Sequence, residues 1–168
     1  QVVPADWLYT NVSNQSQSYG LNGRYYTDNS NAHDLDAASM DPSRLMLARQ
    51  DTNMNLNFGA GAPAQGLQVD NFMARWTGYI TVPKAGTYTL GATSDDGVRI
   101  KVNPGSWQTV LDRWQDQAGT FWGNGVSLPA NTPIPIQVDW FEHGGGAAMD
   151  LRIQGNGLSD QDVPATWL

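Results

Sequence analysis

Regular alternation of apolar and polar residues in the second half of the chain is the feature that most constrains the fold. In the segment FMARWTGYITV, which begins at Phe72, the residues Trp76 and Ile80 share the parity of Phe72. Successive side chains of a β-strand point to opposite faces, so this pattern predicts a strand with one buried and one solvated face. Glycines and prolines, 18 and 9 of the 168 residues, interrupt the chain at short intervals. The sequence therefore predicts an all-β fold, an antiparallel β-sandwich.

The other expected elements follow from the same alternation and from turn signals. Further strands are expected at residues 20–26, 87–94, 97–103, 106–114, 134–140 and 147–155. Residues 27–39 form a polar, turn-rich segment, and loops of this length are often functional. Residues 41–49 have the signals of a short helical turn, because Asp41 can cap it and Pro42 can occupy its first position.

Two adjacent acids interrupt the alternation in GATSDDGVRIKV, residues 91–102. In one unbroken strand Asp96 would point into the core beside Asp95, and a buried, unpaired carboxylate is very costly unless it is neutralised or bound to a metal. A turn is one explanation, and composition alone favours it because Ser-Asp-Asp-Gly is ordinary turn chemistry. The other is that a bulge, a tight turn or a cis peptide brings both carboxylates onto one divalent cation, with Gly97 relaxing the backbone.

Three consecutive glycines lie between two predicted strands in FEHGGGAAM, residues 141–149. A hairpin needs only two turn residues. Either this connection is a loose hairpin, or the extra glycines expose backbone carbonyls, which are good calcium ligands. His143 precedes the glycines and can offer its carbonyl to calcium or its ring to a ligand. Because His33 is the only other histidine, a multi-histidine zinc site is not expected.

The overall composition argues against several classes of function. Sixteen acidic residues against nine basic ones give a formal charge of −7, and no Lys/Arg cluster is present to bind nucleic acid or an anionic membrane. No apolar run approaches the ~20 residues that cross a bilayer, so membrane insertion is not expected. The chain has no cysteine and no recognisable nucleophile–base motif, which predicts a binding module and not an enzyme. Among seven tryptophans, Trp114 and Trp122 are the candidates for exposed stacking surfaces.

The length fits a single domain spanning residues 1–168. Residues 1–15 are interpreted as part of it, as a linker or as the tail of a preceding unit, because VPADWL at 3–8 nearly repeats VPATWL at 163–168. Either two terminal strands lie together, or the chain carries the end of one copy and one full copy of a tandem array. No signal peptide is evident, so secretion would require this chain to be a segment of a longer protein.

The segments GLNGRYY, RWTGYITV, GTYTLGATSDDGVRI, VLDRW, PIQVDWFEHGGGAAMDLRI and VPATWL together resemble the protective-antigen fourteen-kilodalton (PA14) domain family, over about residues 20–168. That family is a β-sandwich found in bacterial toxins, glycosidases and adhesins and in fungal flocculins. In its lectin members, the two aspartates of the motif are joined by a cis peptide and bind one calcium ion. The resemblance places them at Asp95 and Asp96, and it places a second calcium loop at residues 142–146. Fungal members supply an asparagine side chain from that loop, but residues 142–146 of this chain contain no asparagine.

The resemblance implies a calcium-dependent lectin domain of a cell-surface adhesin, which binds adjacent hydroxyls of a terminal monosaccharide through the ion. The implied calcium ligands are Asp95, Asp96, His143 and Gly145. The implied sugar contacts are Asp95, Asp96, Glu142, His143 and Gly144, with Arg113 and residues 115–117 nearby. The expected partners are cell-surface or extracellular glycans, with fucose, glucose and mannose as first candidates. The expected location is extracellular, within a larger secreted protein.

Two other functions remain open on the sequence: a non-catalytic accessory domain of a secreted glycosidase, and a structural interaction domain that binds no sugar. The early polar segments are also open to two interpretations, namely a solvated loop or long loops that hold additional structural calcium. The residues concerned are Asp28, Asp34, Asp36 and Asp51.

Overall fold

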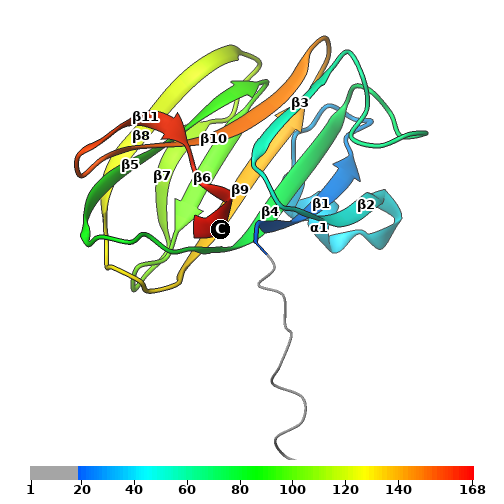
Figure 1. The fold of residues 1–168 in the computed structure, drawn as a ribbon. Helices are drawn as coiled ribbons and strands as arrows, with labels where there is room; N and C mark the ends of the chain where they lie inside the picture. Colours follow the sequence, from blue (N-terminus) through cyan, green and yellow to red (C-terminus); the bar gives the residue numbers. More distant parts are fainter. Residues whose placement is uncertain (1–18) are drawn as a thin grey trace, which may run out of the picture.

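The computed structural model describes residues 19–168, which form a sandwich of two antiparallel sheets (Figure 1). The six-stranded sheet contains, in spatial order, β2 (Leu45–Asp51), β1 (Leu21–Thr27), β4 (Phe72–Ile80), β9 (Ile134–Glu142), β6 (Val98–Val102) and β7 (Gln108–Arg113). The five-stranded sheet contains β11 (Leu158–Asp162), β10 (Ala147–Gly155), β5 (Gly86–Asp95), β8 (Ala118–Leu128) and β3 (Asn55–Gly59), which pairs with the first half of β10. The expected β-sandwich is confirmed. Residues 1–15, with the first copy of the near-repeat, lie outside the described residues.

Short helices occupy the connections. They are α1 (Leu35–Met40), η2 (Pro42–Arg44) and η3 (Ala165–Trp167), of which the last two are 3₁₀-helices. Asp41 caps η2 by accepting from the Ser43 N–H at 3.0 Å, and Pro42 is its first residue, as the sequence predicts. The helix ends after one turn, however, and the following residues form strand β2 because β1 pairs with them.

The core lies between the sheets and contains the inward-facing residues of the predicted strands. Phe72, Trp76 and Ile80 of β4 are at most 1% exposed, whereas Tyr79 on the opposite parity is 57% exposed. The Trp76 ring packs against that of Trp140 from β9, with 6.0 Å between their centroids. Each such side chain contributes about 1.5–3 kcal/mol of burial free energy, so the core holds the two sheets together.

Alternation fails where a second layer covers the outer face of the six-stranded sheet. Met73 and Phe141 have outward parity and are nevertheless 0% exposed. They pack with Tyr26 and with Leu35 and Ala38 of α1 in a small separate cluster. The helix therefore makes the ends of β4 and β9 apolar on both faces.

One carboxylate, Asp51, is buried and fully occupied by protein donors. It is 6% exposed and lies at the end of β2. It accepts hydrogen bonds from the Tyr25 hydroxyl and from Nε1 of Trp76, both at 2.7 Å. Nε of Arg49 donates to its other oxygen at 2.6 Å. Burial, followed by the adjacent Asp51 charge, raises the pKa of Tyr25, so this hydroxyl stays a donor.

The segment GATSDDGVRIKV is not one strand. Residues up to Asp95 belong to β5 in the five-stranded sheet, and Val98 begins β6 in the six-stranded sheet. The paired aspartates therefore lie where the chain crosses between the layers. The apolar residues before and after the pair have the same parity because β5 and β6 both face the same core.

Four strands and one α-helix were not predicted from the sequence, namely β2, described above, with β3, β8, β11 and α1. Strand β8 has three glycines and an exposed first half, so its alternation is weak. Strands β3 and β11 are five residues each and largely exposed. All but the last residue of helix α1 lies in the segment expected to be a loop, at residues 27–39. Each element is held by pairing or packing with distant residues, which local composition does not encode.

The end of the chain packs beside its first described strand. The Gly20 N–H donates to the Leu168 carbonyl at 2.9 Å, and the Thr81 N–H donates to the Trp167 carbonyl at 2.8 Å. The segment VPATWL thus ends in the 3₁₀-helix η3 and not in a strand. Within residues 19–168, none of the helices has the length and apolar character that a bilayer span requires.

Candidate functional site

Three loops that cross between the sheets meet at one rim of the sandwich. Residues 96–97 connect β5 to β6, residues 114–117 connect β7 to β8, and residues 143–146 connect β9 to β10. Strands β8, β5 and β10 are neighbours in one sheet, and β7, β6 and β9 are neighbours in the other. The three loops therefore lie side by side, which places the paired aspartates next to the glycine-rich loop.

Asp96 joins the three loops. Its Oδ1 accepts the Gln117 N–H at 3.1 Å, and its Oδ2 accepts the His143 N–H at 2.9 Å. Asp96 is 7% exposed, while Asp95 is half-buried. The peptide bond between them is cis.

Gly97 is required by a close approach of two chain segments. A Cβ on this residue would lie 2.1 Å from Cε1 of Phe141, whose ring is 0% exposed. The Phe141 N–H donates to the Gly97 carbonyl at 3.0 Å, and the Asp96 N–H donates to the Phe141 carbonyl at 3.3 Å. Since Gly97 does not have a positive φ, contact with β9, and not a special backbone angle, explains the glycine.

A third carboxylate, that of Glu142, completes an acidic cluster with the aspartates. One oxygen each from Asp95, Asp96 and Glu142 lies within 4.8 Å of the other two. Glu142 is 1% exposed, and neither of its oxygens makes a hydrogen bond of normal geometry. Buried polar groups nearly always have hydrogen-bond partners. The described residues supply none of normal geometry for this carboxyl group, so its partner must come from outside them.

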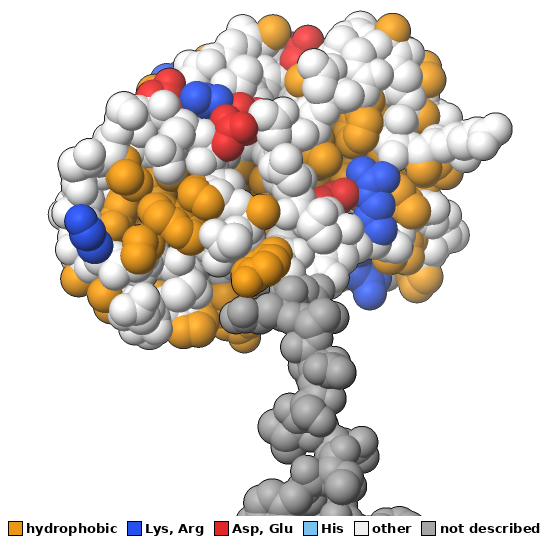
Figure 2. Space-filling view, viewed as in Figure 1, with side chains coloured by type: hydrophobic (Ala, Val, Ile, Leu, Met, Phe, Trp, Pro, Cys, Tyr) orange, Lys and Arg blue, Asp and Glu red, His pale blue; other side chains and the backbone are white. Residues whose placement is uncertain are grey.

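Several acids elsewhere on the molecule have cationic partners. Arg152 pairs with Asp150, Asp160 and Asp162, where charged side chains of both signs lie together over β10 and β11 (Figure 2). Among residues 19–168, no arginine or lysine forms an ion pair with any member of the acidic cluster.

The local electrostatics disfavour three negative charges without a counterion. Burial, together with the charges of Asp96, Asp95 and Asp70, raises the pKa of Glu142 to about 8, against the opposing effect of the Gly144 amide. Burial and the neighbouring Asp96 also raise the pKa of Asp95. The cluster must therefore take up a proton or bind a cation.

This raised pKa predicts how stability without metal depends on pH. The folded Glu142 retains its proton up to about pH 8, whereas the unfolded residue loses it near 4.5. The folded state thus binds more protons in this window, and the free energy of unfolding in chelator should fall as pH rises from 4.5 to 8. Glu142→Gln should remove most of that fall, as measured by urea unfolding at several pH values.

The comparison with the variant is needed because His143 acts in the same direction. Its hydrogen bond and charge interaction with Asp116 raise its pKa, so its contribution is also lost at higher pH. The difference between wild type and Glu142→Gln isolates the glutamate. Parallel pH profiles for the two proteins would show that Glu142 does not titrate in this window.

The acidic cluster has the chemistry of a calcium site. Calcium binds six to eight oxygens at 2.3–2.6 Å, so two of its ligands can lie up to about 5 Å apart. The 4.8 Å limit on Asp95, Asp96 and Glu142 fits that span. The unpartnered oxygens of Glu142 are free to become ligands.

The comparisons with known proteins identify the family. A model of the PA14 domain matches residues 17–165. The chain belongs to the PA14 domain family. The anti-sigma-I factor RsgI3 of Acetivibrio thermocellus is 28% identical over 149 residues, which are 89% of this chain and 21% of that protein. The PA14 domain described here thus spans about a fifth of that relative.

Two solved structures share the fold. An anti-sigma factor domain-containing protein from Clostridium clariflavum matches with a TM-score of 0.74 and 25% identity, over 90% of this chain and 47% of that one. The A domain of epithelial adhesin 6 from Candida glabrata, solved with Galβ1-3GlcNAc, matches with a TM-score of 0.67 and 17% identity, over 93% and 88% of the two chains. At 17% identity the second match shows the fold alone.

The other predicted site residues of this PA14 domain lie around the acidic cluster. His143 is 41% exposed at its side chain and contacts Asp116 in the β7–β8 loop. The Gly145 N–H donates to Oδ1 of Asp70 at 3.3 Å, and a Cβ on Gly146 would lie 3.2 Å from Oδ2 of Asp95. Asp70 was missed because it precedes β4 in an irregular segment whose place at this rim the sequence does not reveal.

The four early aspartates are not brought together. Asp28 accepts from His33 and Arg44, and Asp51 is occupied as described above. Asp34 caps α1 by accepting from the Ala37 N–H, and Asp36 pairs with Arg75 at 2.7 Å. Each carboxylate thus has its own protein partners, in separate places. Additional calcium at these residues stays a prediction without support from their geometry.

The tryptophans expected to be exposed are not the most exposed ones. Trp114 is half-buried, where its ring packs on Phe141 and its Nε1 donates to the His33 carbonyl at 3.0 Å. Trp122 is also half-buried, in strand β8. Trp107 is 53% exposed instead. The expectation is wrong because the segment around Trp122 pairs into a sheet and does not form a loop.

Proposed function

We propose that this PA14 domain binds carbohydrate through a calcium ion held at the acidic cluster. The observation that carries the proposal is Glu142, a buried carboxylate that makes no hydrogen bond of normal geometry and lies beside Asp95 and Asp96. A cation relieves the repulsion among these groups and satisfies the unpartnered oxygens.

Carboxylates and carbonyls of two loops would hold the ion. Asp95, Asp96 and Glu142 supply side-chain oxygens, and the residues 143–145 supply backbone carbonyls. Glu142 stands in for the asparagine of fungal members and acts as a metal ligand, because its burial keeps it from contacting a sugar. When bound, calcium offers its remaining coordination positions to two adjacent hydroxyls of a sugar ring.

The protein groups around the ion orient the sugar. Carboxylates of Asp95 and Asp96 accept hydrogen bonds from the hydroxyls, and the half-exposed His143 ring and the Gly144 backbone lie at the rim where the ring of the sugar would rest. Fucose, glucose and mannose all present adjacent hydroxyls and are the first candidates. A single contact of this size is weak, so useful adhesion requires many copies acting together.

A cell-surface adhesin as the parent protein and an extracellular location are part of this proposal, and the fold is shared with an adhesin domain solved with Galβ1-3GlcNAc. A second parent is favoured by a different observation. The relatives at 25–28% identity are anti-sigma factors, so the same sugar-binding domain can serve as a ligand-sensing part of a regulator. The sequence of the full-length protein distinguishes these two.

A glycan array probed with the 168-residue chain tests the proposal. Binding to terminal monosaccharides should appear in millimolar calcium, disappear in excess chelator, and return when calcium is restored. Binding that persists in chelator would overturn the calcium mechanism. Absence of binding to any glycan would favour a purely structural interaction domain.

A further inference from the structure

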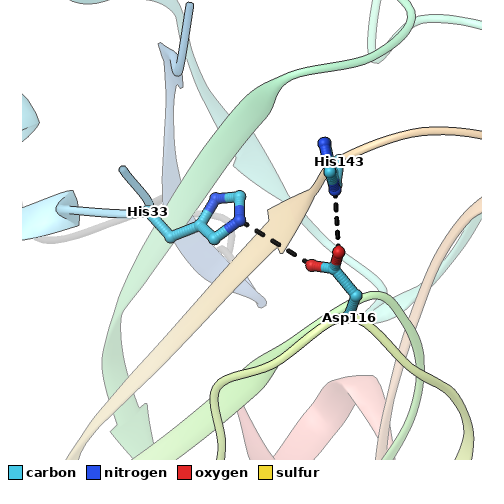
Figure 3. A group of neighbouring side chains, drawn as sticks. All are labelled: His33, Asp116 and His143. Carbon is cyan, nitrogen blue, oxygen red and sulfur yellow. Dashed lines mark hydrogen bonds and ion pairs between the residues drawn. The ribbon is translucent and has the colours of Figure 1, made fainter. Parts of the chain in front are cut away.

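A second group of side chains with metal-binding atoms lies next to the acidic cluster. His33, Asp116 and His143 converge from three loops (Figure 3). Oδ1 of Asp116 is 3.7 Å from Nε2 of His33, and its Oδ2 is 2.8 Å from Nδ1 of His143. One ligand atom of each residue lies within 4.8 Å of the other two. Both histidines of the chain thus meet at one carboxylate, although a chain with only two histidines was not expected to form a multi-histidine zinc site.

A buried carboxylate determines which nitrogen of His33 faces the group. Oδ2 of Asp28, which is 0% exposed, lies 2.6 Å from Nδ1 of His33 and accepts the His33 N–H at 3.0 Å. Because a carboxylate accepts, Nδ1 carries the hydrogen, and in the neutral ring Nε2 presents its lone pair towards Asp116. Metal-binding histidines almost always donate their other ring N–H in this way.

The ring of His33 is held in place before any ion arrives. It stacks on Phe141 with 3.8 Å between centroids and 11° between planes. The His33 carbonyl accepts from Nε1 of Trp114 at 3.0 Å. A ligand fixed in this way loses little freedom on binding.

His143 can take up a matching arrangement if the amide of Asn31 flips. Its Nδ1 faces Asp116, and its Nε2 lies 3.1 Å from Nδ2 of Asn31. An amide can present either its nitrogen or its oxygen. With the Asn31 oxygen turned towards it, Nε2–H donates and Nδ1 becomes the free ligand atom.

The donor set selects the kind of ion. Calcium takes oxygen ligands, whereas imidazole nitrogens suit zinc and similar transition metals, usually with one or two carboxylates or waters. We propose that Nε2 of His33, Nδ1 of His143 and the Asp116 carboxylate bind one zinc-like divalent ion, distinct from the calcium site. Tetrahedral zinc ligands lie about 3.3 Å apart, and the 56% exposed Asp116 side chain is free to make the small adjustment.

An ion here would join the loops that surround the acidic cluster. His33 comes from the β1–α1 connection, Asp116 from the β7–β8 loop and His143 from the β9–β10 loop. The backbone N–H of His143 also donates to Asp96. Zinc is therefore expected to stabilise the rim and to strengthen calcium binding there. The proposal itself does not depend on sugar binding.

Zinc titrated by calorimetry into the 168-residue chain tests this site. The titration is done in millimolar calcium, so that zinc at the acidic cluster is suppressed. One ion per chain is expected, and His143→Gln and Asp116→Asn should each weaken binding at least about tenfold. Asp160→Asn is the matched control, because it removes a similarly exposed carboxylate from β11 and should leave zinc affinity unchanged.

Imidazole ¹⁵N spectra of the unaltered protein give a readout that does not depend on how the variants fold. The chain has only two histidines. One equivalent of zinc should therefore shift the ¹⁵N resonances of Nε2 of His33 and Nδ1 of His143 together. The proposal is overturned by the absence of zinc binding at micromolar concentrations, by displacement of zinc by calcium, by shifts confined to one ring, or by unchanged affinity in both variants.

Discussion

Asp96→Ala should abolish calcium-dependent sugar binding and leave a folded domain. The substitution removes one carboxylate of the acidic cluster and, with it, the acceptor for the N–H groups of Gln117 and His143. Loss of an outer-shell partner alone typically weakens metal binding 10–100-fold. Loss of a ligand that also positions two loops should weaken calcium binding by at least about 100-fold.

The fold should survive because the substitution has opposing effects. Two backbone donors lose their acceptor, which costs about 1–3 kcal/mol for each group that stays buried. At the same time the repulsion that raises the pKa of Glu142 and Asp95 is relieved. Asp96→Asn keeps one acceptor oxygen and serves as the milder variant, with the same expected loss of calcium.

Calcium titration by calorimetry and glycan binding should be measured on the same preparations, with circular dichroism as the check on folding. Asp160→Ala is the control, since Asp160 is half-exposed and pairs with Arg152 away from the three crossover loops. A folded Asp96→Ala protein that keeps wild-type calcium affinity would refute the assignment of the acidic cluster.

The parts of the fold that the sequence predicts are those with one face in the core. Strand β4 alternates because the sandwich interior takes Phe72 and Trp76 while solvent takes Thr77. The prediction fails where another layer intervenes, as at Phe141, which is buried beneath α1 on the face expected to be wet. It also fails for β8, whose exposed glycines carry no periodic signal.

Part of the candidate site was likewise predicted from the sequence, and part was not. The acidic pair and the glycine-rich loop were visible because both break a strand pattern with unusual residues. The role of Glu142 was not visible, since its burial depends on β4, which pairs with it at Phe72. The meeting of His33 with His143 depends on how a long loop returns to the rim, and one sequence does not encode that in any local pattern.

Asp51→Ala should be the most destabilising single substitution among the early aspartates. It would leave the Tyr25 hydroxyl, Nε1 of Trp76 and the Arg49 guanidinium without their shared acceptor in a buried setting. Removing one partner of a buried ion pair costs about 3–5 kcal/mol. For a domain of this size that corresponds to a fall in Tm of roughly 6–20 °C.

The chelator dependence of this loss decides between the two interpretations of Asp51. If the carboxylate serves the hydrogen-bond network, urea unfolding should show the same difference between wild type and Asp51→Ala with and without EDTA. If it held structural calcium, EDTA would lower wild type to the level of the variant. Asp34→Ala is the matched control, because that residue only caps α1 and its loss should cost about 1 kcal/mol. The three protein donors already directed at Asp51 leave it little capacity for an ion, so the difference between the two proteins should persist in chelator.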